Sequence, residues 1–190
     1  MAFDYPVFLD LRAVPVLVVG GGAVALRKAA GLAAAGASVT VVAPTVHPDL
    51  VVLATEVRRR EFVDADVEGQ RLVLTATDRP AVNAAVAAAA TRAGVWVNSA
   101  DDPANCTFIL PAVARRGPVI AAVSSGGASP ALAQALRDEI AAASLGPGVD
   151  GAAADLAGQR DDVKRSGRST EDIDWSERVR VALARARASS

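Results

Sequence analysis

The chain has 190 residues, 52% of them hydrophobic, and its 20 Lys and Arg nearly balance 21 Asp and Glu, giving a formal net charge of −1. This length suits one full domain with a small appendage, and the balanced charge offers no basic field for nucleic acid or a membrane surface. No apolar run nears a bilayer span, the start lacks a secretory signal, and one cysteine and one histidine exclude an internal disulfide and the usual zinc motifs. We therefore expect a cytoplasmic protein with no metal site.

Short β-branched segments alternate with Ala-rich segments over the first hundred residues. The predicted strands are Val14–Val19, Ser38–Ala43, Glu56–Phe62, Leu72–Thr75 and Val95–Asn98, and the predicted helices are Ala23–Ala35, Asp49–Thr55 and Pro80–Ala93. This alternation predicts an α/β fold, a Rossmann-like doubly wound parallel sheet with helices on both faces. Ligands of such a sheet bind beyond the C-terminal ends of its strands.

The pattern changes after the fifth predicted strand. The next elements are two strands, Cys106–Ala114 and Val119–Ser124, which a turn at 115–118 joins into an antiparallel hairpin, and a helix, Ala131–Ala143. The remainder is polar and helical in places, with a narrow apolar stripe of Trp175, Val179 and Leu183 that should dock on the body or on a partner chain. The predicted organisation is a nucleotide-binding domain at 1–112, a small α+β segment at 113–145, and a short, partly flexible helical region at 146–190.

Three glycines, Gly20, Gly21 and Gly22, separate the first predicted strand from the first helix. A turn without Cβ atoms can bend tightly and approach a pyrophosphate, and the helix that follows presents its amides and its positive dipole end to the anion. Read as G-x-G-x-x-A, with Ala25 as the final small residue, the turn matches the dinucleotide-binding fingerprint. An ordinary strand-to-helix turn is the alternative.

The second predicted strand ends at Ala43-Pro44-Thr45, where such folds usually carry an acid that binds the cofactor ribose. Thr45 could replace it more weakly, so the choice between NAD and NADP stays open. The run Arg58-Arg59-Arg60 could bind a 2′-phosphate, but a solvated edge strand is the favoured interpretation, because alternate side chains point to opposite faces.

Polar residues also follow the fourth and fifth predicted strands. After the fifth comes Asn98-Ser99-Ala100-Asp101-Asp102-Pro103, where a carboxylate could hold a proton while a hydride moves to a nicotinamide. An Asx-turn explains the same residues. After the fourth come Thr77 and Asp78, which border the cofactor cleft, although Asp78 could equally cap the next helix.

A second glycine-rich stretch, Ser124 to Pro130, precedes the helix that begins near Ala131. Ser129 as N-cap and Pro130 at the first helical position mark a helix start. Gly126 and Gly127, with two more serines, leave amides and hydroxyls free for carboxylates or phosphates. Plain capping is the simpler interpretation, and the two can coexist.

Six motifs in one order carry a specific resemblance: 6–12, 16–28, 75–83, 98–103, 108–111 and 123–130. Together they resemble precorrin-2 dehydrogenases, which form the amino-terminal module of siroheme synthases, and the likeness covers residues 6 to about 143. It implies NAD-dependent oxidation of precorrin-2 to sirohydrochlorin in siroheme biosynthesis, and dimerisation of the chain through the 113–145 segment. It also assigns the catalytic role to Asp101.

The resemblance and the patterns together define the predicted site. The predicted cofactor-binding residues are Gly20, Gly21, Gly22, Ala23, Val24, Pro44, Thr45, Thr77 and Asp78. The predicted substrate-binding residues are Asn98, Ser124, Ser125, Gly126, Gly127 and Ser129.

Three alternatives stay open, one of them a structural partner subunit that has lost activity, against which the retained Asp101 argues. Some relatives also insert Fe²⁺ into sirohydrochlorin, for which Asp101 and Asp102 are the obvious candidate groups here. The chain could instead be a non-catalytic NAD-sensing regulatory module. Such modules usually hold an acid after the second strand and do not need the serine–glycine stretch, so the enzyme is favoured.

Overall fold

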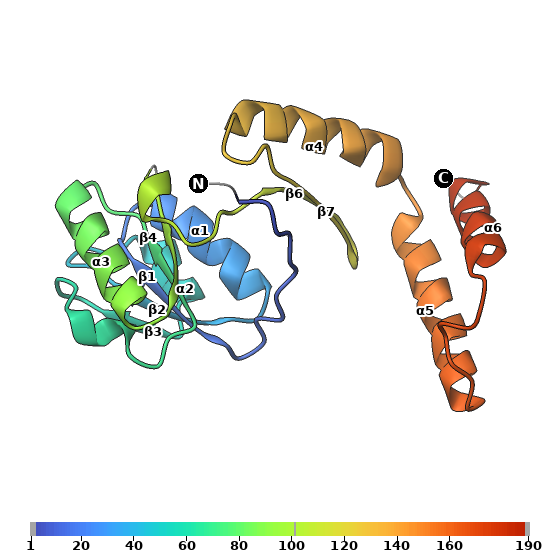
Figure 1. Ribbon diagram of the computed structural model, residues 1–190, viewed down its shortest axis with the longest axis horizontal. Helices are drawn as coiled ribbons and strands as arrows, with labels where there is room; N and C mark the ends of the chain where they lie inside the picture. The colour runs from blue at the N-terminus through green and yellow to red at the C-terminus, as the bar shows by residue number, and fades with distance from the viewer. Residues whose placement is uncertain (1–2, 101, 189–190) are drawn as a thin grey trace. The chain divides into compact units, whose positions relative to one another are not determined.

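The computed structural model describes residues 3–100 and 102–188 (Figure 1). The chain folds as two compact units, one ending at Leu110 and the other beginning at Pro111. Within the described ranges, no helix combines the length and the apolar character needed to cross a bilayer.

The first unit is built on a five-stranded parallel sheet in the order β3-β2-β1-β4-β5. Its strands are β1 Pro15–Val19, β2 Ser38–Val42, β3 Glu56–Arg58, β4 Leu72–Thr75 and β5 Trp96–Ser99. The strand order reverses between β1 and β4, and at such a switch point the C-terminal ends of the strands open a ligand crevice. The predicted Rossmann-like fold is confirmed.

Helices cover both faces of this sheet, as Figure 1 shows. Helices α1 (Ala23–Ala34) and α2 (Pro48–Leu53) lie on one face, and α3 (Pro80–Arg92) lies on the other. Alternate side chains of β1 serve the two layers, because Val16 and Val18 pack under α1 while Leu17 and Val19 pack under α3. Each fully buried Val or Leu stabilises the fold by about 1.5–3 kcal/mol.

The second unit begins with the predicted antiparallel hairpin, β6 (Ala112–Arg116) paired with β7 (Val119–Val123) through a turn at Gly117, whose φ is +53°. Helix α4 (Pro130–Ser144) contacts both strands. Helices α5 (Val149–Arg165) and α6 (Ser176–Ala188) then pack against each other, with Val163 and Ala182 buried.

Two predicted strands have the wrong bounds. The first hairpin strand begins at Ala112 and not at Cys106, because the residues after the short 3₁₀ turn η2 (Pro103–Asn105) bond back to β5: the Thr107 amide donates to the Val97 carbonyl at 2.8 Å. The third strand ends at Arg58 and not at Phe62, because the chain turns toward η1 (Asp64–Val67), a 3₁₀ turn that the sequence pattern did not reveal.

Candidate functional site

The first two glycines of the turn after β1 are required by the backbone around them. Gly20 is buried at φ +131°, and a Cβ there would overlap the Ala76 carbonyl oxygen. A Cβ on Gly21 would overlap the carbonyl oxygen of Thr45. The Gly21 carbonyl accepts a hydrogen bond from the His47 amide at 2.9 Å, so the loops after β1, β2 and β4 are locked together by close backbone approach.

Gly22 differs from its neighbours because its side-chain position is open. Apart from its own helix backbone and chain neighbours, no atom of residues 3–100 and 102–188 lies within 4 Å of the place where its Cβ would stand. It is the N-cap of α1, it makes no side-chain capping bond, and the first turn of the helix has no acidic residue. The first amides of a helix, here those of Ala23 and Val24, have no partner within the helix and attract anions. Open space, free donors and a positive dipole end fit the pyrophosphate of a dinucleotide.

Pro44 and Thr45, predicted to lie at the ribose, follow β2 and are exposed. The Thr45 backbone touches the glycine turn, and the structure therefore brings these two segments together at one end of the sheet.

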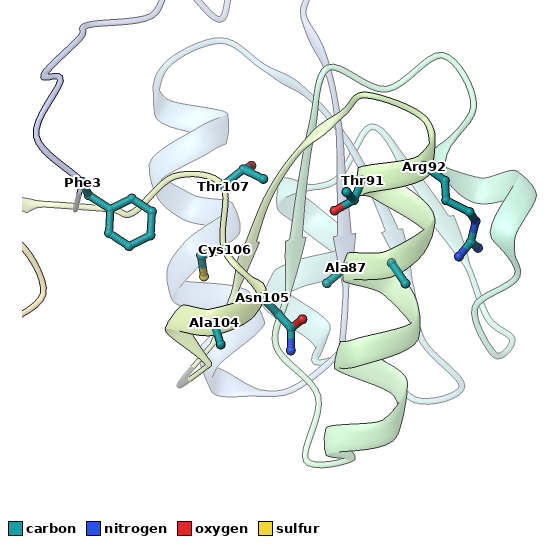
Figure 2. Close-up of a pocket in the computed structure, with 9 residues that line it drawn as sticks. Phe3, Ala87, Thr91, Arg92, Ala104, Asn105, Cys106 and Thr107 are labelled. Atoms are coloured by element: carbon teal, nitrogen blue, oxygen red, sulfur yellow. The ribbon is translucent and has the colours of Figure 1, made fainter. Parts of the chain in front are cut away.

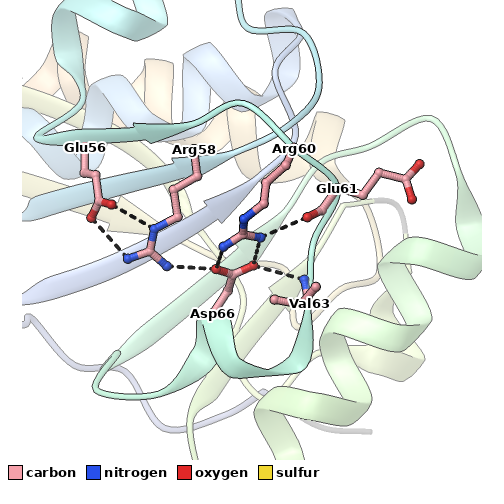
Figure 3. A network of polar contacts seen from close by, with 6 residues as sticks. All are labelled: Glu56, Arg58, Arg60, Glu61, Val63 and Asp66. Carbon is pink, nitrogen blue, oxygen red and sulfur yellow. Dashed lines mark hydrogen bonds and ion pairs between the residues drawn. The ribbon is translucent and has the colours of Figure 1, made fainter.

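The arginine run beyond β3 is held by a buried carboxylate (Figure 3). Asp66, whose side chain is 1% exposed, accepts hydrogen bonds from Arg58 at 2.8 Å, from Arg60 at 2.7 and 2.5 Å, and from the Val63 amide at 3.0 Å. Burial alone would raise the pKa of Asp66, but the bonds from Arg60, Val63 and Arg58 together lower it to about 2. Arg58 and Arg60 are thus ion-paired and not simply solvated, whereas Arg59, the middle residue of the run, is exposed.

The loop after β4 is shaped by Asn83 of α3, which is 6% exposed. Its Oδ1 accepts hydrogen bonds from the hydroxyl of Thr75 and from the amide and hydroxyl of Thr77, at 3.2 and 2.8 Å for Thr77, and its Nδ2 donates to the Thr77 carbonyl at 3.1 Å. Asp78 is exposed and does not cap α3, whose N-cap is Arg79. Asn83 therefore fixes a loop predicted to contact the cofactor.

The side chain of Asn98, near the end of β5, is 6% exposed and bonded within the protein. Its Oδ1 accepts a hydrogen bond from Lys28 Nζ at 2.6 Å, and its Nδ2 donates to the Phe108 carbonyl at 3.0 Å. Asp101 lies outside the residues that the structure describes, so its catalytic role stays a prediction. The carboxylate of Asp102 accepts a bond from Asn105 Nδ2 at 2.6 Å.

The serine–glycine stretch belongs to the second unit. Its Ser125 hydroxyl accepts from the Ser129 amide and donates to the Ser129 carbonyl, both at 2.9 Å, and Ser124 Oγ accepts from the Gly126 amide at 3.1 Å. Ser129 caps α4 through the Leu132 amide at 3.2 Å, as predicted. The left-handed conformations of Gly126 and Gly127, φ +64° and +89°, allow this tight turn. Substrate binding by the stretch stays a prediction.

One cavity of about 760 Å³ lies between α3 and residues 104–107, with Phe3 at its border (Figure 2). Thr91, Arg92 and Cys106 are among its lining residues, and none of the predicted site residues that the structure describes is. In residues 3–100 and 102–188, no three His, Cys, Asp or Glu side chains are grouped to hold a metal ion.

Comparison with known proteins agrees with this geometry. A family model described as putative NAD(P)-binding matches residues 7–112, more than half of the chain, and one described as sirohaem biosynthesis protein central matches residues 117–143. A siroheme synthase from Methylococcus capsulatus is 52% identical over 142 residues, which are 72% of this chain and 30% of that protein. A siroheme synthase from Tolumonas auensis is 47% identical over 167 residues, 85% of this chain and 35% of that protein. The chain thus spans about a third of the length of these relatives.

A solved structure, the precorrin-2 dehydrogenase SirC, superposes with a TM-score of 0.71 at 26% identity, over 97% of this chain and 99% of that one. This match extends over both units, including the helices beyond the two family models. The chain therefore belongs to the putative NAD(P)-binding family, and its likeness to siroheme synthases and to a precorrin-2 dehydrogenase confirms the resemblance predicted from its motifs.

Proposed function

We propose that this protein oxidises precorrin-2 to sirohydrochlorin with NAD in siroheme biosynthesis. In this reaction precorrin-2 loses a hydride to the nicotinamide and a proton to a base, giving sirohydrochlorin, NADH and H⁺. The observation that carries the proposal is the open Gly22 position at the N-terminus of α1, at the switch point of a Rossmann-like sheet. The name of the structural neighbour supports the choice of substrate.

Different residues along the crevice are proposed to bind the cofactor and to take the proton from the substrate. The turn at Gly20 to Gly22 and the amides of Ala23 and Val24 bind the pyrophosphate, and Thr77, held by Asn83, lies beside the cofactor. Bound NAD supplies the hydride acceptor. Asp101 takes the proton from the substrate, since a strand-end carboxylate is a suitable general base.

NAD rather than NADP is proposed because the carboxylate of Asp66 binds Arg58 and Arg60, two of the three arginines beyond the end of β2 that the sequence offered for a 2′-phosphate. The backbone places them near that end, since the Ala43 amide donates to the Arg58 carbonyl at 3.2 Å. The serine–glycine stretch at Ser124 to Ser129 is proposed to bind the carboxylates of the tetrapyrrole.

The proposal includes a homodimer formed through residues 113–145, with 146–190 as a helical region, and a cytoplasmic location with access to NAD. The support for the dimer is a row of apolar side chains on α4 at helical spacing: Leu132, Leu136 and Ile140 are 51%, 39% and 40% exposed.

The decisive experiment incubates the purified protein anaerobically with precorrin-2 and either NAD or NADP, recording sirohydrochlorin and reduced cofactor together. We expect equal amounts of sirohydrochlorin and NADH, with a slower reaction for NADP. A reaction without cofactor is the control. Tight NAD binding without any product would instead support the NAD-sensing module and would overturn the proposal.

A further inference from the structure

Three side chains form a continuous polar connection between α1 and the segment that follows β5. Lys28, in the second turn of α1, donates to Asn98 Oδ1 at 2.6 Å. Asn98 Nδ2 in turn lies 3.7 Å from the sulfur of Cys106, within the range of a weak hydrogen bond to sulfur. We call these residues the Lys28 bridge.

The sulfur of Cys106 contacts Ser99 and Asp102, the two residues that flank positions 100 and 101 in the sequence. It accepts a hydrogen bond from the Ser99 amide at 3.1 Å and lies 3.3 Å from the carbonyl oxygens of Ser99 and Asp102. Cys106 is 6% exposed, and burial raises the pKa of its thiol, so the neutral S–H form is the one that makes these contacts. Two residues, 100 and 101, separate the bonded ends.

The Lys28 bridge connects the helix that is expected to bind the cofactor with the strand that precedes the proposed base. Helix α1 begins at Ala23, directly after Gly22, where the cofactor pyrophosphate is expected, and β5 ends two residues before Asp101. Lys28 and Asn98 are 70 positions apart in the sequence, so their bond fixes the cofactor helix to the strand that precedes the proposed base. A half-buried ammonium that bonds to a buried amide gives a directional contact of the stronger, charge-assisted kind.

We propose that Lys28 is a positioning residue for the dehydrogenation: acting through Asn98, it holds the segment that carries Asp101 in place relative to the cofactor helix. This inference rests on the proposed function. It predicts that loss of the ammonium group loosens residues 98–106 and slows hydride transfer, while the pyrophosphate site stays intact.

The first readout does not need activity. Cys106 is the single cysteine of the chain, so the rate at which an aromatic disulfide reagent labels the native protein reports the opening of this segment. Lys28→Met should label about ten times faster than wild type, in keeping with the loss of one charge-assisted hydrogen bond. Lys28→Arg should label more slowly than Lys28→Met. Arg27→Met, which removes the exposed neighbouring cation on α1, is the matched control and should label like wild type.

The second readout is turnover of precorrin-2. Lys28→Met should lower kcat about tenfold or more with little change in the KM for NAD, and in an Asn98→Ala background it should lower kcat by a smaller factor, because the contact between the two side chains is already lost. Unchanged labelling of Lys28→Met, or full additivity of the two substitutions, would overturn the inference. A wild-type protein without turnover would defeat the proposed function instead, and the labelling rates would still measure whether Lys28 holds the segment.

Discussion

The guanidinium of Arg60 and the carboxylate of Asp66 form a two-pronged ion pair, with hydrogen bonds of 2.7 and 2.5 Å. The Asp66 side chain is almost fully buried, whereas that of Arg60 is 44% exposed. The pair fastens the end of the edge strand β3 to the 3₁₀ turn η1, beside the expected adenosine end of the cofactor site.

Asp66 should make the stability of the first unit depend on acidity. Its pKa in the folded protein is about 2, below the usual value of 3.8 for an aspartate, so its contribution to stability is present above pH 4 and is lost as the pH falls from about 4 to about 2. That shift corresponds to about 2 kcal/mol at neutral pH. Asp66→Asn should therefore lower the free energy of unfolding by about 2–3 kcal/mol at pH 7, measured by urea denaturation.

The difference in the free energy of unfolding between Asp66→Asn and wild type should become smaller as the pH falls toward 2. Asp64→Asn is the control, since its bond to Arg92 joins two exposed side chains and is worth little. If the difference in the free energy of unfolding between Asp66→Asn and wild type stayed constant from pH 7 to pH 2, this would contradict the lowered pKa of Asp66.

Gly22→Asp should separate cofactor binding from folding. Aspartate is a favoured N-cap and the position is open, so the melting temperature should stay the same or rise slightly. The new carboxylate would occupy the place expected for the pyrophosphate and repel it, and NAD affinity measured by calorimetry should fall at least tenfold. Gly20→Ala should instead lower the melting temperature, because its Cβ would overlap the carbonyl oxygen of Ala76. Unchanged NAD affinity in Gly22→Asp would argue against the site.

Patterns with local causes were predictable from the sequence. The alternation of Val-rich strands and Ala-rich helices gave the sheet and its helices, and the Ser129–Pro130 pair marked the start of α4 correctly. The glycine turn was identified as a unit, although its three residues differ: Gly20 and Gly21 serve backbone packing and Gly22 faces open space.

Contacts between distant residues were not predictable in the same way. Asn83 of α3 fixes the loop at Thr77, after β4, through side-chain hydrogen bonds. Asp66 forms ion pairs with two arginines whose sequence pattern had indicated a solvated edge strand. Periodicity carries no signal for such pairs. The early start of the hairpin strand at Cys106 was wrong for the same reason, since the bonds of that cysteine to Ser99 and Asp102 depend on the folded loop.

The apolar row on α4 gives a prediction about assembly. Leu136→Glu places a charge at the centre of the row of Leu132, Leu136 and Ile140, and a dimer that buries this row should dissociate. Light scattering after size exclusion should then report a monomer for Leu136→Glu and a dimer for wild type. Gln134→Glu, an exposed change elsewhere on α4, should leave the dimer intact. A monomeric wild-type protein, or a dimeric Leu136→Glu, would remove this row from the interface.

Asp101→Asn tests the proton acceptor of the proposed reaction. The change keeps the size of the side chain and removes its basicity, so kcat for precorrin-2 should fall by about 10²–10⁴ while NAD affinity is retained. Asp102→Asn is the matched control, because that carboxylate is bonded to Asn105, and the variant should keep most of its turnover. The measurement is anaerobic formation of NADH at saturating precorrin-2. If Asp102→Asn lost turnover and Asp101→Asn kept it, the base would be the second of the two neighbouring carboxylates.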